Sequence, residues 1–149
     1  MNMKKYVVLL VTLLLAIPAS AQLNVKAKSS VKPIGSVRTG IINVFQADSL
    51  FYISLKTDNN YDDPGIFDLG KGKDAAFATL DDMVQILNEG EPGEAYQVDG
   101  GHGRTCTLVV AKQLGVRILK FSFPECAGSQ SMSKGELDKV KDIVDKNGK

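Results

Sequence analysis

The chain has 149 residues, with 18 basic side chains, 17 acidic side chains and one histidine, so its formal net charge is +1. A charge this close to zero argues against nucleic acid or an anionic membrane as the partner, because both require a basic face. A chain of this length with 44% hydrophobic residues can bury a core without help from metals or crosslinks.

Residues 1–21 have the pattern of a secretory signal peptide. Two lysines precede the uncharged run YVVLLVTLLLAI (6–17), which is shorter than the roughly 20 residues of a membrane-spanning helix. Small residues in an A-x-A arrangement end at Ala21, where signal peptidase would cut. We therefore expect a secreted or periplasmic protein that begins at Gln22 and has no stable membrane insertion. An uncleaved anchor is the alternative.

Removal of 21 residues from 149 leaves a mature chain of 128 residues. Its first part, residues 22–35, is polar and lacks periodicity, which predicts a flexible N-terminal segment. We expect residues 36–149 to form a single domain, and no internal repeat is visible in the sequence.

The chain contains two cysteines, Cys106 and Cys126. Exported proteins meet oxidising conditions, where an even number of cysteines favours a disulfide. We predict a Cys106–Cys126 disulfide, which closes a loop of about 20 residues and contributes about 3 kcal/mol in the chain-entropy account. Two buried free thiols are the alternative.

Segments typical of strands occupy the first half of the domain. SVRTGIINVFQ (36–46) and the alternating LFYISLKT (50–57) are predicted to form a hairpin through a short link. The turn-forming residues of DNNYDDPG (58–65) predict a surface loop, and IFDL (66–69) predicts a short strand.

Two helices are predicted. The first covers residues 74–88, with Asp74 as its N-cap. Its apolar side chains recur at spacings of three and four at Phe77, Leu80, Val84 and Leu87. The second covers residues 133–144 and starts with a capping box of Ser133 and Glu136. Its apolar stripe consists of Leu137, Val140 and Val144.

Three further strands are predicted between the helices, at EAYQV (94–98), TCTLVVAK (105–112) and VRILKFSF (116–123). The last two are predicted to form a hairpin whose turn centres on Leu114. This register places Cys106 opposite Ser122, from where Cys126 can fold back to reach it.

The strands follow one another through hairpin-length links rather than alternating with helices. We therefore predict an α+β fold, with an antiparallel sheet of about five to six strands and two helices packed on one face. A doubly wound parallel sheet is disfavoured because it needs repeated crossovers, of which this chain has at most one or two.

The stretch VDGGHGRTCT (98–107) contains the only histidine. We predict an exposed glycine-rich turn that leads into the strand starting near Thr105. A ligand-binding loop composed of Gly101, His102, Gly103 and Arg104 is the alternative, and catalysis by His102 is a third reading. One histidine with two cysteines does not supply a zinc site, and no G-x-S-x-G motif is present. We assign no catalytic residue, no metal and no cofactor.

Other suggestive stretches have simpler explanations. GIFDLGKG (65–72) approaches a phosphate-binding loop, but Gly72 stands where a hydroxyl is required. The acids of residues 58–65 lack the EF-hand spacing, although a looser calcium site there stays open. The neighbouring Asp81 and Asp82 point in different directions on a helix, which indicates a solvated face.

These observations predict a small exported binding module without enzymatic activity, which recognises a protein or a small ligand through a sheet face or loops. The alternatives are a small secreted hydrolase that uses His102 and a structural subunit that assembles through a strand edge.

Overall fold

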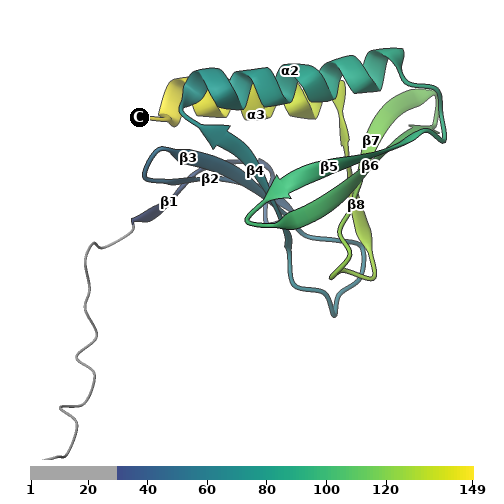
Figure 1. The fold of residues 1–149 in the computed structure, drawn as a ribbon, viewed down its shortest axis with the longest axis horizontal. Coiled ribbons are helices and arrows are strands. Elements are labelled where there is room, and N and C mark those ends of the chain that lie inside the picture. The colour runs from purple at the N-terminus through teal and green to yellow at the C-terminus, as the bar shows by residue number, and fades with distance from the viewer. Residues whose placement is uncertain (1–29) are drawn as a thin grey trace, which may run out of the picture.

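The computed structural model describes residues 30–149 (Figure 1). The predicted signal peptide and the first part of the predicted N-terminal segment lie outside the described residues. Within residues 30–149 the chain forms four strands and a helix, and then four strands and a helix again. The fold is therefore α+β, as predicted.

We call the two halves the first unit and the second unit. The first unit contains β1 (Val31–Arg38), β2 (Ile42–Ala47), β3 (Leu50–Leu55), β4 (Gly65–Lys71) and α2 (Lys73–Glu89). The second unit contains β5 (Ala95–Gly101), β6 (Arg104–Gln113), β7 (Val116–Ser122), β8 (Ser129–Ser133) and α3 (Lys134–Asn147). Each unit has its own four-stranded antiparallel sheet, with the strands in chain order.

The prediction of a single sheet with five to six strands is wrong, because the structure has two sheets of four strands each. Two strands were missed because they lack an apolar pattern. One is β1, which includes a proline and a glycine, and the other is β8, with the polar sequence SQSMS. Residues 31–35, predicted as part of a flexible segment, belong to β1. The predicted strand 36–46 is divided by a turn at Gly40, whose φ is +72°.

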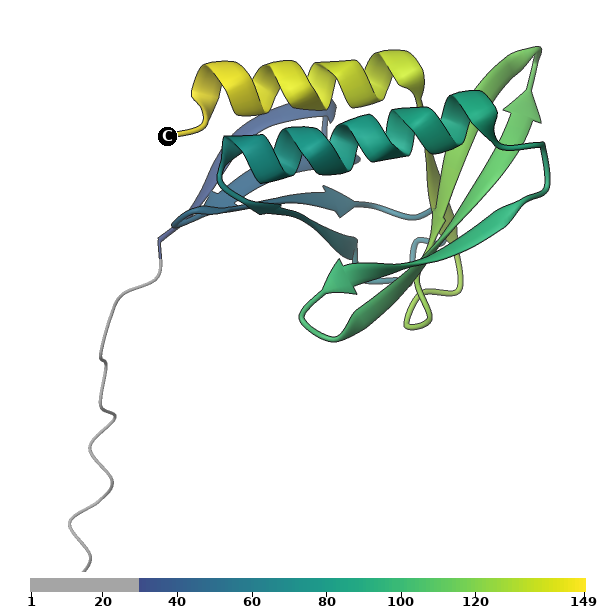
Figure 2. The same ribbon diagram turned by 45° about the horizontal axis from the view of Figure 1, so that its top comes forward.

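The two helices lie side by side over both sheets (Figures 1 and 2). Helix α2 packs against β4 of its own unit and β7 of the other, and α3 packs against β1, β2 and β8. Each helix therefore contacts both sheets. Residues of both units form one hydrophobic cluster. At its centre the rings of Phe67 and Phe121 meet edge to face, with their centroids 5.9 Å apart.

Both predicted helices are present, but the first residue of each differs from the prediction. Helix α2 begins after Gly72, so Asp74 lies in the first turn and is not the N-cap. Its buried side chains are Ala76, Leu80, Met83 and Leu87, whereas Phe77 and Val84 lie at the flank of this stripe. Helix α3 begins one residue later than predicted and confirms the capping box. Its Ser133 Oγ accepts from the Glu136 amide at 3.3 Å, and Glu136 Oε2 accepts from the Ser133 amide at 2.9 Å. Its predicted apolar stripe is buried.

The hairpin of β6 and β7 is shifted by one residue from the predicted register. Its turn has two residues, Leu114 and Gly115, with φ of +50° and +80°. Two-residue turns with positive φ match the twist of paired strands, so this turn is favoured over the predicted longer one. As a result Thr107, and not Cys106, lies opposite Ser122.

The predicted Cys106–Cys126 disulfide is not formed, and both cysteines are free. The physical reason is the alternation of side chains along β6, which places Cys106 with Leu108 and Val110 on the core face, where it is fully buried. Cys126 lies in the β7–β8 loop, with its Sγ 3.4 Å from the carbonyl oxygen of Asp63. Burial raises the pKa of the Cys106 thiol to about 12.

Candidate functional site

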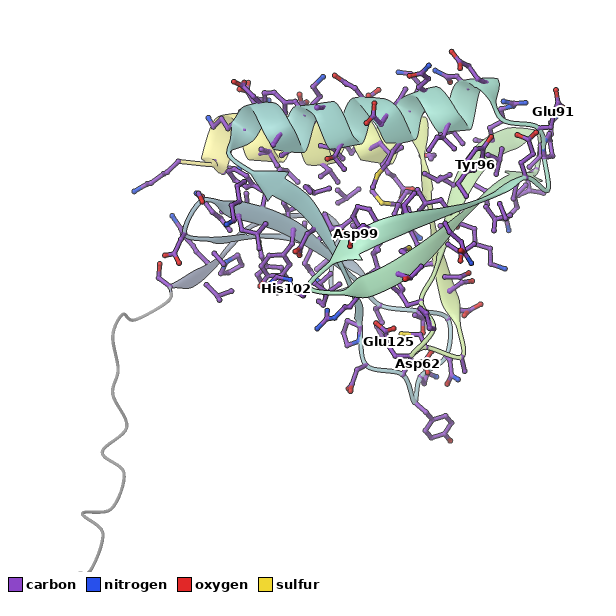
Figure 3. All side chains as sticks on the ribbon, in the orientation of Figure 1. Asp62, Glu91, Tyr96, Asp99, His102 and Glu125 are labelled. Atoms are coloured by element: carbon purple, nitrogen blue, oxygen red, sulfur yellow. The ribbon has the colours of Figure 1, made fainter. Side chains whose placement is uncertain are left out.

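The candidate ligand-binding loop is the turn between β5 and β6. His102 and Gly103 form a two-residue turn with φ of +54° and +71°, and Gly101 pairs with Arg104 across it. The Gly101 amide donates to Asp99 Oδ1 at 2.9 Å, which fixes the approach to the turn. Residues 101–104 therefore form one hairpin tip, where Figure 3 shows His102.

The hairpin tip rests on Asp68 of the first unit, a residue that the sequence reasoning missed. His102 Nδ1 lies 2.8 Å from Asp68 Oδ2. The His102 side chain is 65% exposed, whereas the Asp68 side chain is only 15% exposed, so the carboxylate is held beneath the imidazole. A Cβ added to Gly101 would overlap the same carboxylate, which means that the backbone of the tip packs directly against it.

Asp68 belongs to a row of side chains that crosses the first sheet. It lies opposite Tyr52 of β3, which in turn lies opposite Phe45 of β2. The rings of Phe45 and Tyr52 are stacked, with centroids 5.2 Å apart and planes 11° apart. We call Phe45, Tyr52, Asp68 and His102 the outer row. Partial burial, followed by the negative charge of Asp68, raises the pKa of Tyr52.

The outer row lies on the face of the first sheet that is turned away from the helices. Side chains alternate between the two faces of a strand, and the intervening residues Val44, Ile53 and Phe67 are buried in the core. The row's sheet positions are half-buried, as are the neighbouring Ala47, Leu50 and Ile66. This face therefore presents apolar and aromatic surface beside a histidine–carboxylate pair.

The outer face of the second sheet is different in character. It contains a shallow hollow of about 450 Å³, whose lining includes Lys120, Ser129 and Ser131. The positions corresponding to the two stacked rings are occupied by Ala111 and Ile118. Serines and a lysine around small apolar residues are typical of a solvated sheet face.

The acids of the β3–β4 loop bind backbone amides of the β7–β8 loop. The Asp62 carboxylate accepts from the amides of Gly128 at 2.7 Å and Ala127 at 3.1 Å, and from the Thr57 hydroxyl at 2.8 Å. Asp58 Oδ1 accepts from the Ser129 amide at 2.9 Å. The Gly128 and Ala127 amides are the main causes that lower the pKa of Asp62. In residues 30–149 no three potential metal ligands of the His, Cys, Asp or Glu type converge.

The remaining acid pair and the glycine-lysine stretch have structural explanations. Asp81 faces α3, where Lys141 Nζ lies 2.8 Å from Asp81 Oδ1. Asp82 lines a groove between α2 and β5 instead. The stretch 65–72 forms β4 and the residue that precedes α2.

His102 and Asp68 have the arrangement of a histidine held by a carboxylate, as in acid–base catalysis. Such a pair needs a nucleophile to act on an acyl group. The Cys106 thiol is unsuited to that role, because it is buried on the core face and its pKa is raised to about 12. The arrangement thus supplies an oriented imidazole at the surface.

Comparison with protein-family models, with curated proteins and with solved structures found no match for this chain. Within residues 30–149, no helix is both long and apolar enough to cross a membrane. The function has to be inferred from the side chains themselves.

Proposed function

We propose that the protein is an exported binding module without enzymatic activity, which recognises a protein partner through the outer face of its first sheet. The supporting observation is the contrast between two outer faces that are built on the same strand order. Counted from the two-residue hairpin turns, Phe45 and Tyr52 occupy the positions that Ala111 and Ile118 occupy in the second unit. Aromatic side chains at outward positions of one face are typical of an interaction surface.

A protein partner suits this face better than a small ligand. Small ligands bind in concave sites that enclose most of their surface, whereas protein interfaces combine a centre rich in tyrosine and phenylalanine with a polar rim. Phe45 and Tyr52 supply such a centre on an open sheet face. Asn43 and the His102–Asp68 pair supply polar groups around it.

His102 has a specific role at the rim. When its Nδ1 carries the proton that Asp68 accepts, the other ring nitrogen, Nε2, is an acceptor in the neutral imidazole. The exposed side chain can therefore accept a hydrogen bond from an amide or hydroxyl of the partner. Asp68 fixes the direction of that bond, because it holds the ring from below.

A matched pair of substitutions tests the binding face. Proteins captured by the wild type from the exported fraction of the producing cells are compared with those captured by Tyr52→Ser and by Ile118→Ser. We expect Tyr52→Ser to capture the partner at least about tenfold less than the wild type does, as for an aromatic hot spot. Ile118→Ser should capture it as the wild type does. Thermal unfolding of both variants checks that the fold is intact. Equal capture by all three proteins contradicts the proposed face.

The second candidate function is that of a small hydrolase, and the 2.8 Å contact between His102 and Asp68 favours it. Hydrolysis of simple ester and peptide substrates by the wild type and by His102→Ala distinguishes the two functions. We expect no turnover that depends on His102. Loss of a measurable activity on replacement of His102 would favour the hydrolase.

Export is part of the proposal and is supported by the sequence pattern of residues 1–21. The intact mass of protein recovered from outside the cytoplasm should correspond to a chain that begins at Gln22. A mass that still includes Met1 contradicts cleavage.

A further inference from the structure

Two of the four edge strands, β1 and β8, cannot readily pair with a further strand. The edge strand β1 contains Pro33, has two register shifts and is covered by α3. The edge strand β8 has two of its carbonyl groups occupied. The Ser129 carbonyl accepts from the Asp58 amide at 3.0 Å, and the Ser131 carbonyl accepts from the Arg38 guanidinium. Prolines, bulges and covering segments are the usual ways to protect an edge.

The third edge, β4, is also covered. Helix α2 packs along β4, and the hairpin tip presses Gly101 against Asp68 of this strand. The fourth edge strand, β5, pairs with β6 on one side only in the described part of the chain. It contains neither proline nor lysine.

The register shows which groups of β5 are directed outward. The Val110 amide donates to the Glu94 carbonyl at 3.0 Å, so residues 94, 96 and 98 are the hydrogen-bonded positions of this antiparallel ladder. The amides and carbonyls of the alternate residues, Ala95 and Gln97, therefore point away from β6. These groups can pair with one more strand.

A groove runs beside this edge, between β5 and the flank of α2. It has a volume of about 530 Å³ and is lined by Asp82, Gln85, Ile86, Glu89, Gly90 and Tyr96. Ile86 and Tyr96 are partly buried and supply apolar walls. Residues of one face of an added strand would project into this groove, on the same side as Tyr96.

The charge around the groove is negative. Asp82 and Glu89 line the groove. Glu91 and Glu94 precede β5, Glu91 lies near Tyr96 (Figure 3), and the Glu94 carboxylate accepts from the Tyr96 hydroxyl at 2.6 Å. The last turn of α2 itself contains no basic residue. The nearby Arg117 is engaged with the carbonyls of Leu87 and Asn88, at 2.9 and 2.8 Å.

We propose that β5 binds an extended, basic segment of a partner protein as an added strand. Backbone hydrogen bonds to Ala95 and Gln97 provide the pairing. Lysine or arginine side chains enter the groove, with their stems on Ile86 and Tyr96 and their charged ends near the carboxylates. A second copy of this chain does not suit the edge, because pairing β5 with itself brings two acidic grooves together.

A synthetic peptide of alternating lysine and threonine, seven residues long like β5, serves as the probe. Amide hydrogen exchange of the protein is measured by NMR with and without the peptide. We expect new protection at Ala95 and Gln97, whereas Tyr96 and Val98 are already protected by β6. An alternating glutamate and threonine peptide should give no protection.

Paired substitutions test the charge requirement. The double variant Asp82→Asn, Glu89→Gln should bind the lysine peptide about tenfold more weakly. The control Asp138→Asn, Asp142→Asn removes two carboxylates from α3, outside the groove, and should change the affinity less than about twofold. Tyr52→Ser should bind the peptide normally, so this result is independent of the proposed function of the outer row.

Three results would overturn the inference. The first is peptide binding that protects amides elsewhere but not Ala95 and Gln97. The second is equal weakening by both double variants, which would indicate a general effect of net charge. The third is protection of the β5 amides without peptide that rises with protein concentration, which would identify a second copy as the occupant.

Discussion

The central hairpins of the two units, β2–β3 and β6–β7, both have two-residue turns. Residues that lie opposite each other can therefore be matched between the units by counting from the turn. At inward positions the pairs are alike, with Val44 opposite Ile53 in the first unit and Val110 opposite Leu119 in the second. At the next outward position they differ, because the stacked Phe45 and Tyr52 correspond to Ala111 and Ile118. Inward pairs maintain the fold in both units, whereas outward pairs are free to serve binding.

The two units differ in their edges as well as in their faces. The edge strands of the first unit are covered by helices and carry a bulge, whereas β5 of the second unit is open beside an acidic groove. The units nevertheless share one core, since each helix packs on both sheets. The comparison therefore concerns surfaces on a single folding unit.

Substitution of a core ring should test the shared core most severely. Phe121 is fully buried and meets Phe67 of the other unit. We expect Phe121→Ala to lower the free energy of unfolding by about 3–5 kcal/mol and both units to unfold in one transition. Urea unfolding followed by fluorescence and by circular dichroism measures both. The control Tyr61→Ala, at a side chain that is 99% exposed, should change stability by less than about 0.5 kcal/mol. Separate transitions would show that the units are independent.

Both cysteines belong to the second unit, and their reactivity should differ strongly. Cys106 is fully buried with a pKa of about 12, whereas Cys126 is only partly buried. In the native protein we expect iodoacetamide to label Cys126 at least about a hundredfold faster than Cys106, because the thiolate is the reactive form. Peptide mass mapping over time gives the two rates. Recovery of a disulfide-linked peptide from unreduced protein would contradict the free thiols.

Much of the fold could be predicted where the determinants are local. The capping box of Ser133 and Glu136 depends on residues three apart, and in both helices the apolar side chains recur at spacings of three and four. The β2–β3 hairpin was recognisable from the alternation of its second strand. In each case neighbouring residues in the chain carry the signal.

The rest depends on contacts between distant residues. The polar strand β8 is held by pairing with β7 and by hydrogen bonds to the β3–β4 loop. Its own sequence predicts neither contact. The two-residue turn at Leu114 shifts the register of β6 and β7 by one residue from the predicted one, and Cys106 is buried on the core face of β6 instead of forming the predicted disulfide. For the candidate site, the turn at residues 101–104 was predicted, but its partner Asp68 was not. The two units bring His102 and Asp68 together only after folding.

The contact between the units can be tested by comparing Gly101 of the β5–β6 hairpin with Gly115 of the β6–β7 hairpin. Gly101 has φ of +89° and faces the Asp68 carboxylate, whereas Gly115 has φ of +80° with nothing near its missing Cβ. We expect Gly115→Ala to cost about 1 kcal/mol for backbone strain alone. Gly101→Ala should cost about 2–3 kcal/mol, since it adds the displacement of Asp68. Equal losses in urea unfolding would mean that the tip does not press on the first unit.

Acid should weaken the hydrogen bonds by which Asp62 joins the β3–β4 loop to the β7–β8 loop. Hydrogen bonds from Gly128 and Ala127 lower the pKa of Asp62, so its contribution to stability is present above its unfolded pKa and is lost as the pH falls through its folded pKa. Asp62→Asn should therefore unfold at lower urea than the wild type at neutral pH, and the gap should narrow below about pH 4. Asp63→Asn serves as the control, because the bonds to Gly128 and Ala127 come from Asp62. A gap that is constant with pH would show that Asp62 acts without its charge.

The smallest effect, and the sharpest comparison, concerns the first residues of the two turns, His102 and Leu114. Both have positive φ, of +54° and +50°, and both precede a glycine. Asparagine is favoured at this position, so Leu114→Asn measures the gain in turn stability, a few tenths of a kcal/mol. His102→Asn should have the same gain but lose the contact with Asp68. Since His102 is 65% exposed, the difference between the variants should be about 0–1 kcal/mol. A larger difference would mean that Asp68 needs its partner for stability, and the outer row would then be a structural feature of the junction between units rather than a surface kept for binding.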